Sequence, residues 1–148
     1  MKGYWNKKEE SEKALKGGWM HTGDAGRMDE EGFVFIQDRI KDMIVSGGEN
    51  IYSTEVEAAL FAHPDVVDAA VIGVPDEKYG EVVKACIVKK EGSNVTEDDL
   101  ISFCKDRIAS YKKPQSVDFI DEVPRNASGK VLKKVLREPY WKDQERQV

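Results

Sequence analysis

The sequence predicts an α+β fold: a small two-layer C-terminal domain with a three-stranded sheet flanked by helices, preceded by a short helix and a β-hairpin. Residues 66–74 and 82–88 are rich in β-branched side chains and are joined by a short turn, which predicts two adjacent strands. Residues 117–120 supply a third strand, and apolar side chains at helical spacing predict the helices. With 148 residues, 40% of them hydrophobic, the chain is long enough for one domain and a small appendage.

The first 38 residues predict the appendage. A helix begins after Asn6, a favourable N-cap, and ends at Gly17-Gly18. Residues 19–22 predict a strand. Residues 25–28 and 33–37 predict a hairpin, because the turn-forming sequence Asp-Glu-Glu-Gly lies between them.

A second unit is predicted from residue 39 onward. A short apolar strand at 43–45 leads into the loop Ser-Gly-Gly, and Thr54 and Glu57 have the spacing of a capping box at the start of a helix. Pro64 marks the end of that helix. Thr96 and Asp99 predict a second helix in the same way.

A last helix is predicted at 131–137, after the loop that follows the third strand. The helices and the sheet together account for the two predicted layers.

Composition excludes several classes of protein. The net charge of −5 and the absence of a long basic face argue against binding of duplex nucleic acid. No apolar stretch approaches the ~20 residues of a membrane span. The only two cysteines, Cys86 and Cys104, are expected to be reduced and buried, as in a cytoplasmic protein. Basic residues gather in 101–148, which suits either an anionic ligand such as a nucleotide or a solvated helical surface.

Four segments carry candidate chemistry. They are Thr-Gly-Asp at 22–24, Asp-Arg-Ile-Lys-Asp at 38–42, Ser-Gly-Gly-Glu-Asn-Ile-Tyr at 46–52 and Pro-Arg-Asn-Ala-Ser-Gly-Lys at 124–130. Taken singly, each is also typical of a surface turn or a solvated lysine. The last is not a phosphate-binding P-loop, because its first glycine and its Ser/Thr after the lysine are missing.

Together and in this order, these segments resemble the C-terminal part of the adenylate-forming (AMP-binding) enzymes, in particular acyl-CoA synthetases of the long-chain fatty-acid–CoA ligase type. Gly-Tyr-Trp-Asn at 3–6 and Gly-Glu at 80–81 are similar to that family as well. The resemblance implies that residues 1–38 are the tail of the larger N-terminal AMP-binding domain. It implies that residues 39–148 are the C-terminal mobile lid domain.

The resemblance also implies a two-step reaction. A carboxylic acid attacks the α-phosphorus of ATP and gives an acyl-adenylate and pyrophosphate; the thiol of coenzyme A then displaces AMP and gives a thioester. ATP/AMP and coenzyme A are therefore the expected substrates, with Mg²⁺ accompanying ATP but not bound by this fragment. No metal-ligand cluster surrounds His21 or His63, so no metal site is expected.

The resemblance assigns three residues to the first step and one to the hinge between the steps. Lys130 corresponds to the catalytic lysine, whose cation offsets charge that develops during phosphoryl transfer. Asp24 corresponds to the ribose-binding aspartate, and Arg39 to an arginine near the ribose and phosphate. Lys41 stands at the hinge about which the lid rotates between the two steps.

The second step is assigned to a further set of residues by the resemblance. Gly47, Gly48 and Glu49 would line the pantetheine channel, where glycines permit close approach of a ligand to the backbone. The nucleotide end of coenzyme A would meet Tyr79, Tyr111 and Lys113; the two tyrosines fit core or surface aromatic positions equally well.

The sequence contains no phosphate loop and nothing similar to an acyl pocket, so the isolated chain is expected to be inactive. Its expected partners are the N-terminal domain of the same enzyme and a small carboxylic acid of unidentified type, and the exposed hairpin could support a homo-oligomer. Two alternatives stay open: a stand-alone module that binds coenzyme A or a partner without catalysis, and an adenylation domain that serves a carrier protein.

Overall fold

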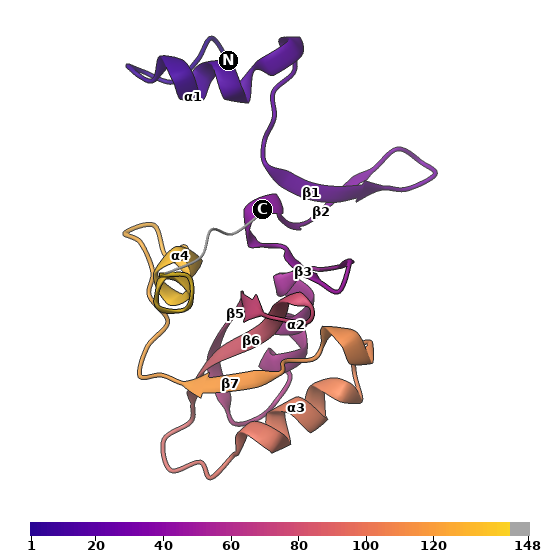
Figure 1. Cartoon of the computed structure of the whole chain (residues 1–148), viewed down its shortest axis with the longest axis vertical. Helices are drawn as coiled ribbons and strands as arrows, with labels where there is room; N and C mark the ends of the chain where they lie inside the picture. The colour runs from indigo at the N-terminus through magenta and orange to yellow at the C-terminus, as the bar shows by residue number, and fades with distance from the viewer. Residues whose placement is uncertain (143–148) are drawn as a thin grey trace. The chain divides into compact units, whose positions relative to one another are not determined.

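The computed structural model describes residues 1–142 and divides the chain into two compact units, Met1–Lys41 and Asp42–Val148 (Figure 1). The predicted domain boundary at residues 38–39 falls inside the last strand of the first unit, β2 (Val34–Arg39). The two units are described in turn.

The first unit contains one helix and one hairpin. Helix α1 spans Lys8–Ala14, the short 3₁₀ turn η1 spans Lys16–Gly18, and β1 (Asp24–Met28) pairs antiparallel with β2. The predicted helix and hairpin are therefore confirmed. The predicted strand at 19–22 is wrong: the amide of His21 donates to the carbonyl of Ala14 (2.7 Å), so this segment closes the preceding helix and pairs with no described strand.

The second unit is built on a five-stranded sheet, where the sequence predicted a three-stranded sheet and a further short strand at 43–45. The strands are β3 (Ile44–Ser46), β4 (Glu49–Ile51), β5 (Val66–Asp76), β6 (Gly80–Lys89) and β7 (Ser116–Phe119). Their order is β4-β3-β6-β5, and β7 lies parallel to β6. Strands β5 and β6 pair antiparallel with one register shift between Val66 and Asp68, which confirms the prediction that they are neighbours in the sheet.

Strand β4 was not predicted, because its three residues, Glu-Asn-Ile, are too few to show an alternation of polar and apolar side chains. It forms because Gly47 and Gly48 both adopt positive φ (59° and 89°) between the paired residues Ser46 and Glu49. Two residues with positive φ make the tight hairpin turn whose twist matches that of antiparallel strands. The turn therefore adds β3 and β4 to the sheet.

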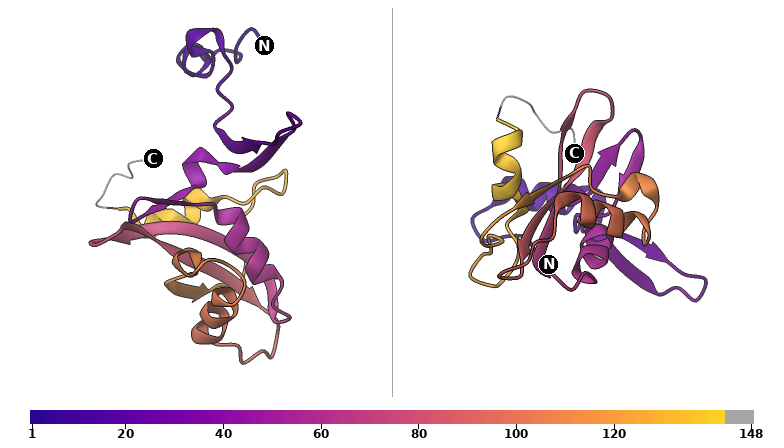
Figure 2. Two further views of the ribbon diagram at one scale, coloured as in Figure 1. Left: turned by 90° about the vertical axis from the view of Figure 1, so that its right-hand side faces the viewer. Right: turned by 90° about the horizontal axis from the view of Figure 1, so that it is seen from below.

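Helices cover both faces of the sheet (Figure 2). Helices α2 (Ser53–Phe61) and α3 (Glu97–Lys105) pack on one face through a core that includes Ile44, Leu60, Val71, Ile87 and Leu100. On the other face the short helix α4 (Lys133–Arg137) places Leu136 against a small cluster of Ile72, Val74 and Cys86. Helix α4 thus adds a third layer to the two that were predicted.

The two predicted capping boxes differ in outcome. At α3, Thr96 and Asp99 make the reciprocal bonds of a capping box, as expected. At α2, the N-cap is Tyr52 and makes no side-chain capping bond. The Glu57 carboxylate accepts a hydrogen bond from the amide of Val71 in β5 (2.8 Å) and forms an ion pair with Lys133 of α4 (2.7 Å).

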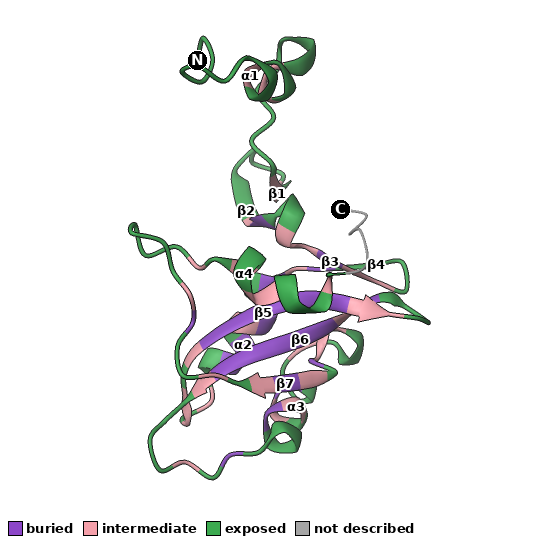
Figure 3. Cartoon of the chain, turned by 60° about the vertical axis from the view of Figure 1, so that its left-hand side comes forward, coloured by how far each residue is buried: buried purple, intermediate pink, exposed green. Residues whose placement is uncertain are grey.

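Burial follows the two central strands (Figure 3). Both cysteines are buried and free, and burial raises the pKa of the Cys86 and Cys104 thiols to about 11. They therefore stay protonated near neutral pH and act as small apolar side chains. No helix in the described part of the chain is long and apolar enough to cross a membrane.

Leu100 gives a direct test of this core. Its side chain is fully buried under α3, so Leu100→Ala should lower the free energy of unfolding by about 2–5 kcal/mol, through lost burial and a residual cavity. Urea unfolding of the chain measures this change. Leu132→Ala is the control, because Leu132 is 37% exposed and its truncation should cost far less. Equal losses in the two variants would contradict the proposed core.

Candidate functional site

Asp24 and Arg39 lie side by side in the first unit. They are paired residues at the open end of the β1–β2 hairpin, and Arg39 Nε lies 3.1 Å from Asp24 Oδ1. Gly23, with φ 76°, turns the chain into β1, and its carbonyl accepts from the amide of Ile40 (2.8 Å). The hairpin therefore presents a carboxylate and an exposed guanidinium at one place.

Lys130 lies at the end of a tight turn in the second unit. The amide of Asn126 donates to the Lys130 carbonyl (2.9 Å), and the amide of Gly129 donates to the Asn126 carbonyl (2.9 Å). The Asn126 side chain accepts from the amides of Ser128 and Lys130 (3.0 and 2.9 Å). In a three-residue hairpin loop, a turn is followed by one residue in the left-handed conformation, and Gly129, with φ 80°, takes that position. The backbone of Lys130 is thus well defined.

The side chain of Lys130 differs from the other cations around it. Lys133 pairs with Glu57 (2.7 Å) and Arg137 with Asp42 (3.0 Å), and both pairs are largely buried. These pairs attach α4 to the rest of the second unit. Lys130 is exposed, and its ammonium group has no ion pair or hydrogen bond among the described residues.

The glycine-rich turn and Tyr79 meet at the other end of the sheet. The amide of Gly47 donates to the Tyr79 carbonyl (2.9 Å), and Ser46 pairs with Gly80. A Cβ atom on Gly47 would lie 3.2 Å from the Tyr79 ring, so the turn and the ring are in close contact. The structure thus brings Gly47, Gly48, Glu49 and Tyr79 together, as one exposed surface.

Tyr111 and Lys113 come from the short 3₁₀ segment η3 (Ser110–Lys112) and the residue after it. Tyr111 is 49% exposed. The segment is held by Lys112, whose ammonium donates to both carboxylate oxygens of Glu55 at the start of α2 (2.8 and 2.7 Å). Sequence reasoning missed this pair, because the two residues are 57 positions apart and have no motif in common.

The turn that carries Lys130 and the Gly47–Gly48 turn lie at opposite ends of the β5–β6 hairpin. Arg125, at the base of the Lys130 turn, pairs with Asp68 near the start of β5, whereas the Gly47–Gly48 turn adjoins Gly80, which pairs with Asp76 at the end of β5. Eight residues of strand at ~3.3 Å each separate Asp68 from Asp76 by about 26 Å. Figure 3 shows the loop before α4 near one end of β5 and β6 and the β3–β4 turn near the other.

Lys41 is the last residue of the first compact unit. It lies in the 3₁₀ turn η2 (Ile40–Asp42), between β2 and β3. The next residue, Asp42, is anchored in the second unit by its ion pair with Arg137. The division between the units therefore follows Lys41.

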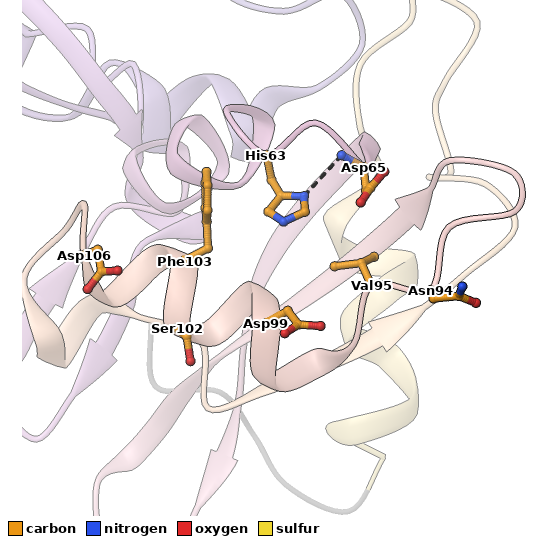
Figure 4. Close-up of a pocket in the computed structure, with 8 residues that line it drawn as sticks. All are labelled: His63, Asp65, Asn94, Val95, Asp99, Ser102, Phe103 and Asp106. Atoms are coloured by element: carbon orange, nitrogen blue, oxygen red, sulfur yellow. Dashed lines mark hydrogen bonds between the residues drawn. The ribbon is translucent and has the colours of Figure 1, made fainter.

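An open hollow lies between the end of α2 and α3 (Figure 4). His63 accepts through Nδ1 from the amide of Asp65 (3.2 Å) and packs edge-on against Phe103, with ring centroids 4.7 Å apart. None of the residues predicted to bind substrate lines it. Within residues 1–142, no group of three or more His, Cys, Asp or Glu side chains could hold a metal ion.

Comparison with known proteins gives a consistent set of similarities. The family model "AMP-binding enzyme C-terminal domain" matches residues 55–130. The chain is 47% identical, over 95% of its length, to the long-chain-fatty-acid–CoA ligase FadD13 of Mycobacterium tuberculosis. It is 48% identical, over 98% of its length, to the fatty acid–acyl-carrier-protein ligase ScoC of Streptomyces coeruleorubidus. It spans only 28% of the length of each relative.

A solved structure agrees with these relatives. O-succinylbenzoate CoA synthetase (MenE) from Bacillus subtilis, in complex with an acyl-adenylate intermediate, superposes on 99% of this chain with a TM-score of 0.85 and 42% identity. The chain covers 28% of that protein. The likeness extends over both compact units, since nearly the whole chain is aligned.

Proposed function

This chain belongs to the AMP-binding enzyme C-terminal domain family, and from that premise we propose that it is the C-terminal part of an ATP-dependent acyl-CoA synthetase. The complete ligase would join a carboxylic acid to the α-phosphate of ATP, with release of pyrophosphate. The sulfur of coenzyme A would then attack the acyl carbon and release AMP. The acid would bind in a part of the ligase outside this chain.

The observation that carries the proposal is the placement of Lys130 and the glycine-rich turn at opposite ends of one rigid hairpin. The strand residues next to these two groups, Asp68 and Asp76, lie about 26 Å apart along β5, so the two groups cannot serve one acyl group in a single orientation of the domain. They can serve it in turn if the domain rotates between the two steps. Lys41, at the division between the compact units, is where we propose the rotation occurs.

In the first orientation, Lys130 would contact the carboxylate and the α-phosphate. Its exposed ammonium group, without a partner among the described residues, is available for such anions. The positive charge would stabilise the charge that builds up on the phosphoryl oxygens in the transition state. This is an electrostatic role and needs no proton transfer by the lysine.

Asp24 and Arg39 would hold the nucleotide. One oxygen of Asp24 already forms an ion pair with the Arg39 guanidinium (3.1 Å), and its other oxygen would accept from a ribose hydroxyl. The exposed guanidinium keeps further donors for phosphate or ribose oxygens. We further propose that residues 1–38 are the end of the larger nucleotide-binding domain, and that Mg²⁺ enters with ATP.

In the second orientation, Gly47, Gly48 and Glu49 would line the path of the pantetheine arm. Tyr79, Tyr111 and Lys113 would meet the nucleotide end of coenzyme A by stacking and charge. The similarity to a fatty acid–acyl-carrier-protein ligase supports a second candidate acceptor, the phosphopantetheine of a carrier protein. The two free cysteines are consistent with a cytoplasmic enzyme.

Pyrophosphate exchange tests the proposal. The isolated chain, mixed with ATP, labelled pyrophosphate and a panel of carboxylic acids, should show no exchange, because Asp24, Arg39 and Lys130 alone offer only a few polar contacts to ATP. The complete ligase should exchange with at least one acid. Exchange by the isolated chain, or a complete ligase that activates no acid of the panel, would contradict the proposal.

A further inference from the structure

We propose that Arg125 is a positioning residue for Lys130: its guanidinium joins the Asp68 carboxylate of β5 to the Gly129 carbonyl and so fixes the peptide unit that presents the lysine. The inference rests on the proposed role of Lys130 in adenylate formation. It assigns to Arg125 no contact with the substrate.

Arg125 is tied to the sheet by a two-oxygen contact. Its Nη2 donates to Asp68 Oδ1 and Oδ2 at 2.9 and 2.8 Å. Asp68 is itself well held, because it lies in β5 and its Oδ1 accepts from the amide of Ala69 (2.9 Å). An ionic contact to a strand of the central sheet gives the guanidinium a fixed location.

The same guanidinium reaches the turn. Arg125 Nη1 donates to the carbonyl oxygen of Gly129 (3.0 Å). That oxygen belongs to the peptide unit whose amide is the N–H of Lys130, and this N–H donates to Asn126 Oδ1 (2.9 Å). Both polar ends of one planar unit are therefore held, which fixes the direction in which the Lys130 side chain leaves the backbone.

The other cations of the segment do not perform this task. Lys133 and Arg137 pair with Glu57 and Asp42 and so attach α4 to the rest of the second unit, whereas Arg125 pairs with β5 and reaches the turn. The planar guanidinium holds its two terminal nitrogens in a fixed geometry, so Nη2 donates to the Asp68 carboxylate while Nη1 donates to the Gly129 carbonyl. A lysine at position 125 keeps the charge and loses one of the two contacts.

Two substitutions test the proposal in the complete ligase. Arg125→Lys and Asp68→Asn should each slow adenylate formation by about tenfold or more, since small displacements of a reacting group have effects of that order. Thioester formation from supplied acyl-adenylate should keep its rate, because Lys130 takes no part in it. Lys134→Ala, which removes an exposed cation of the same segment, is the matched control and should adenylate normally.

Amide NMR of the isolated chain supplies a readout that does not depend on activity. In Arg125→Lys, the resonances of Gly129 and Lys130 should shift and their amide exchange should quicken, while those of β6 stay in place. A variant that lost the fold would instead change the resonances of the whole second unit.

Three results would overturn the proposal: normal adenylation by Arg125→Lys, equal slowing of both half-reactions, or unchanged Gly129 and Lys130 amides. Failure of the proposed function gives a different pattern, in which Lys130→Ala itself adenylates at the parent rate. In that case Arg125 would have no positioning role in catalysis, and the NMR comparison would still decide whether Arg125 fixes the turn.

Discussion

Lys130→Ala should slow adenylate formation by the complete ligase by ~10²-fold or more, the usual effect of removing one group that stabilises transition-state charge. The substitution removes an exposed cation that bears none of the described side-chain contacts of the domain, so folding should be unaffected. Single-turnover formation of acyl-adenylate from ATP and acid measures the rate. The affinity for ATP should change little by comparison.

The second half-reaction provides the internal control for that result. Lys130→Ala, supplied with acyl-adenylate and coenzyme A, should form thioester at the parent rate, because the glycine-rich turn lies at the far end of the β5–β6 hairpin. Lys134→Ala should leave both half-reactions intact. Adenylation by Lys130→Ala at the parent rate would remove the lysine from the mechanism.

Lys41→Pro should uncouple the two half-reactions. Proline fixes φ near −65° and also restricts the preceding residue, Ile40, so that the backbone cannot rotate between two orientations. Enforcing an incompatible backbone conformation costs of order 1–3 kcal/mol, so one half-reaction should fall by about tenfold or more while the other persists. The overall rate then follows the slower step.

Measurement of each half-reaction separately distinguishes this outcome from misfolding. Lys41→Ala is the matched control, because alanine removes the same side chain and leaves the backbone free to rotate. It should retain both steps. A Lys41→Pro ligase with an unchanged overall rate would exclude rotation at this position.

The predicted elements that the structure confirms are those that depend on short stretches of sequence. The β5–β6 hairpin follows from two runs of β-branched residues around one turn, and α3 from the capping box of Thr96 and Asp99. Helix α2 formed at the expected place although its predicted cap did not. Glu57 in this helix contacts Val71 in β5 and Lys133 in α4, and no local sequence pattern indicates these contacts.

Strand β4 and the third layer were missed for a related reason. A three-residue strand carries too little periodicity to be recognised, and it is stable only because a two-glycine turn places it beside β3. Helix α4 itself was predicted, at 131–137, but its place on the second face of the sheet was not, because Lys133 and Arg137 hold it through partners that lie far away in the sequence. Such short elements depend on tertiary contacts for their stability.

In the candidate site, too, the residues could be predicted from local sequence, whereas the contacts between them could not. Asp24, Arg39, Lys130 and the glycine-rich segment could be picked out from their motifs, because each contains the residue types that its chemistry requires. The pairing of Asp24 with Arg39, the contact of Gly47 with Tyr79 and the bridge from Arg125 to Gly129 could not. They join residues that only the folded backbone brings within hydrogen-bond distance.

By itself, then, the sequence determined which residues carry charge, where the main strands and helices form and which family the motifs resemble, since these depend on side-chain chemistry and on spacing within a few residues. Tertiary structure alone decided that Lys130 and the glycine-rich turn lie at opposite ends of one hairpin. That separation depends on strand register and on ion pairs between distant residues, and neither quantity is encoded in any short stretch of the chain.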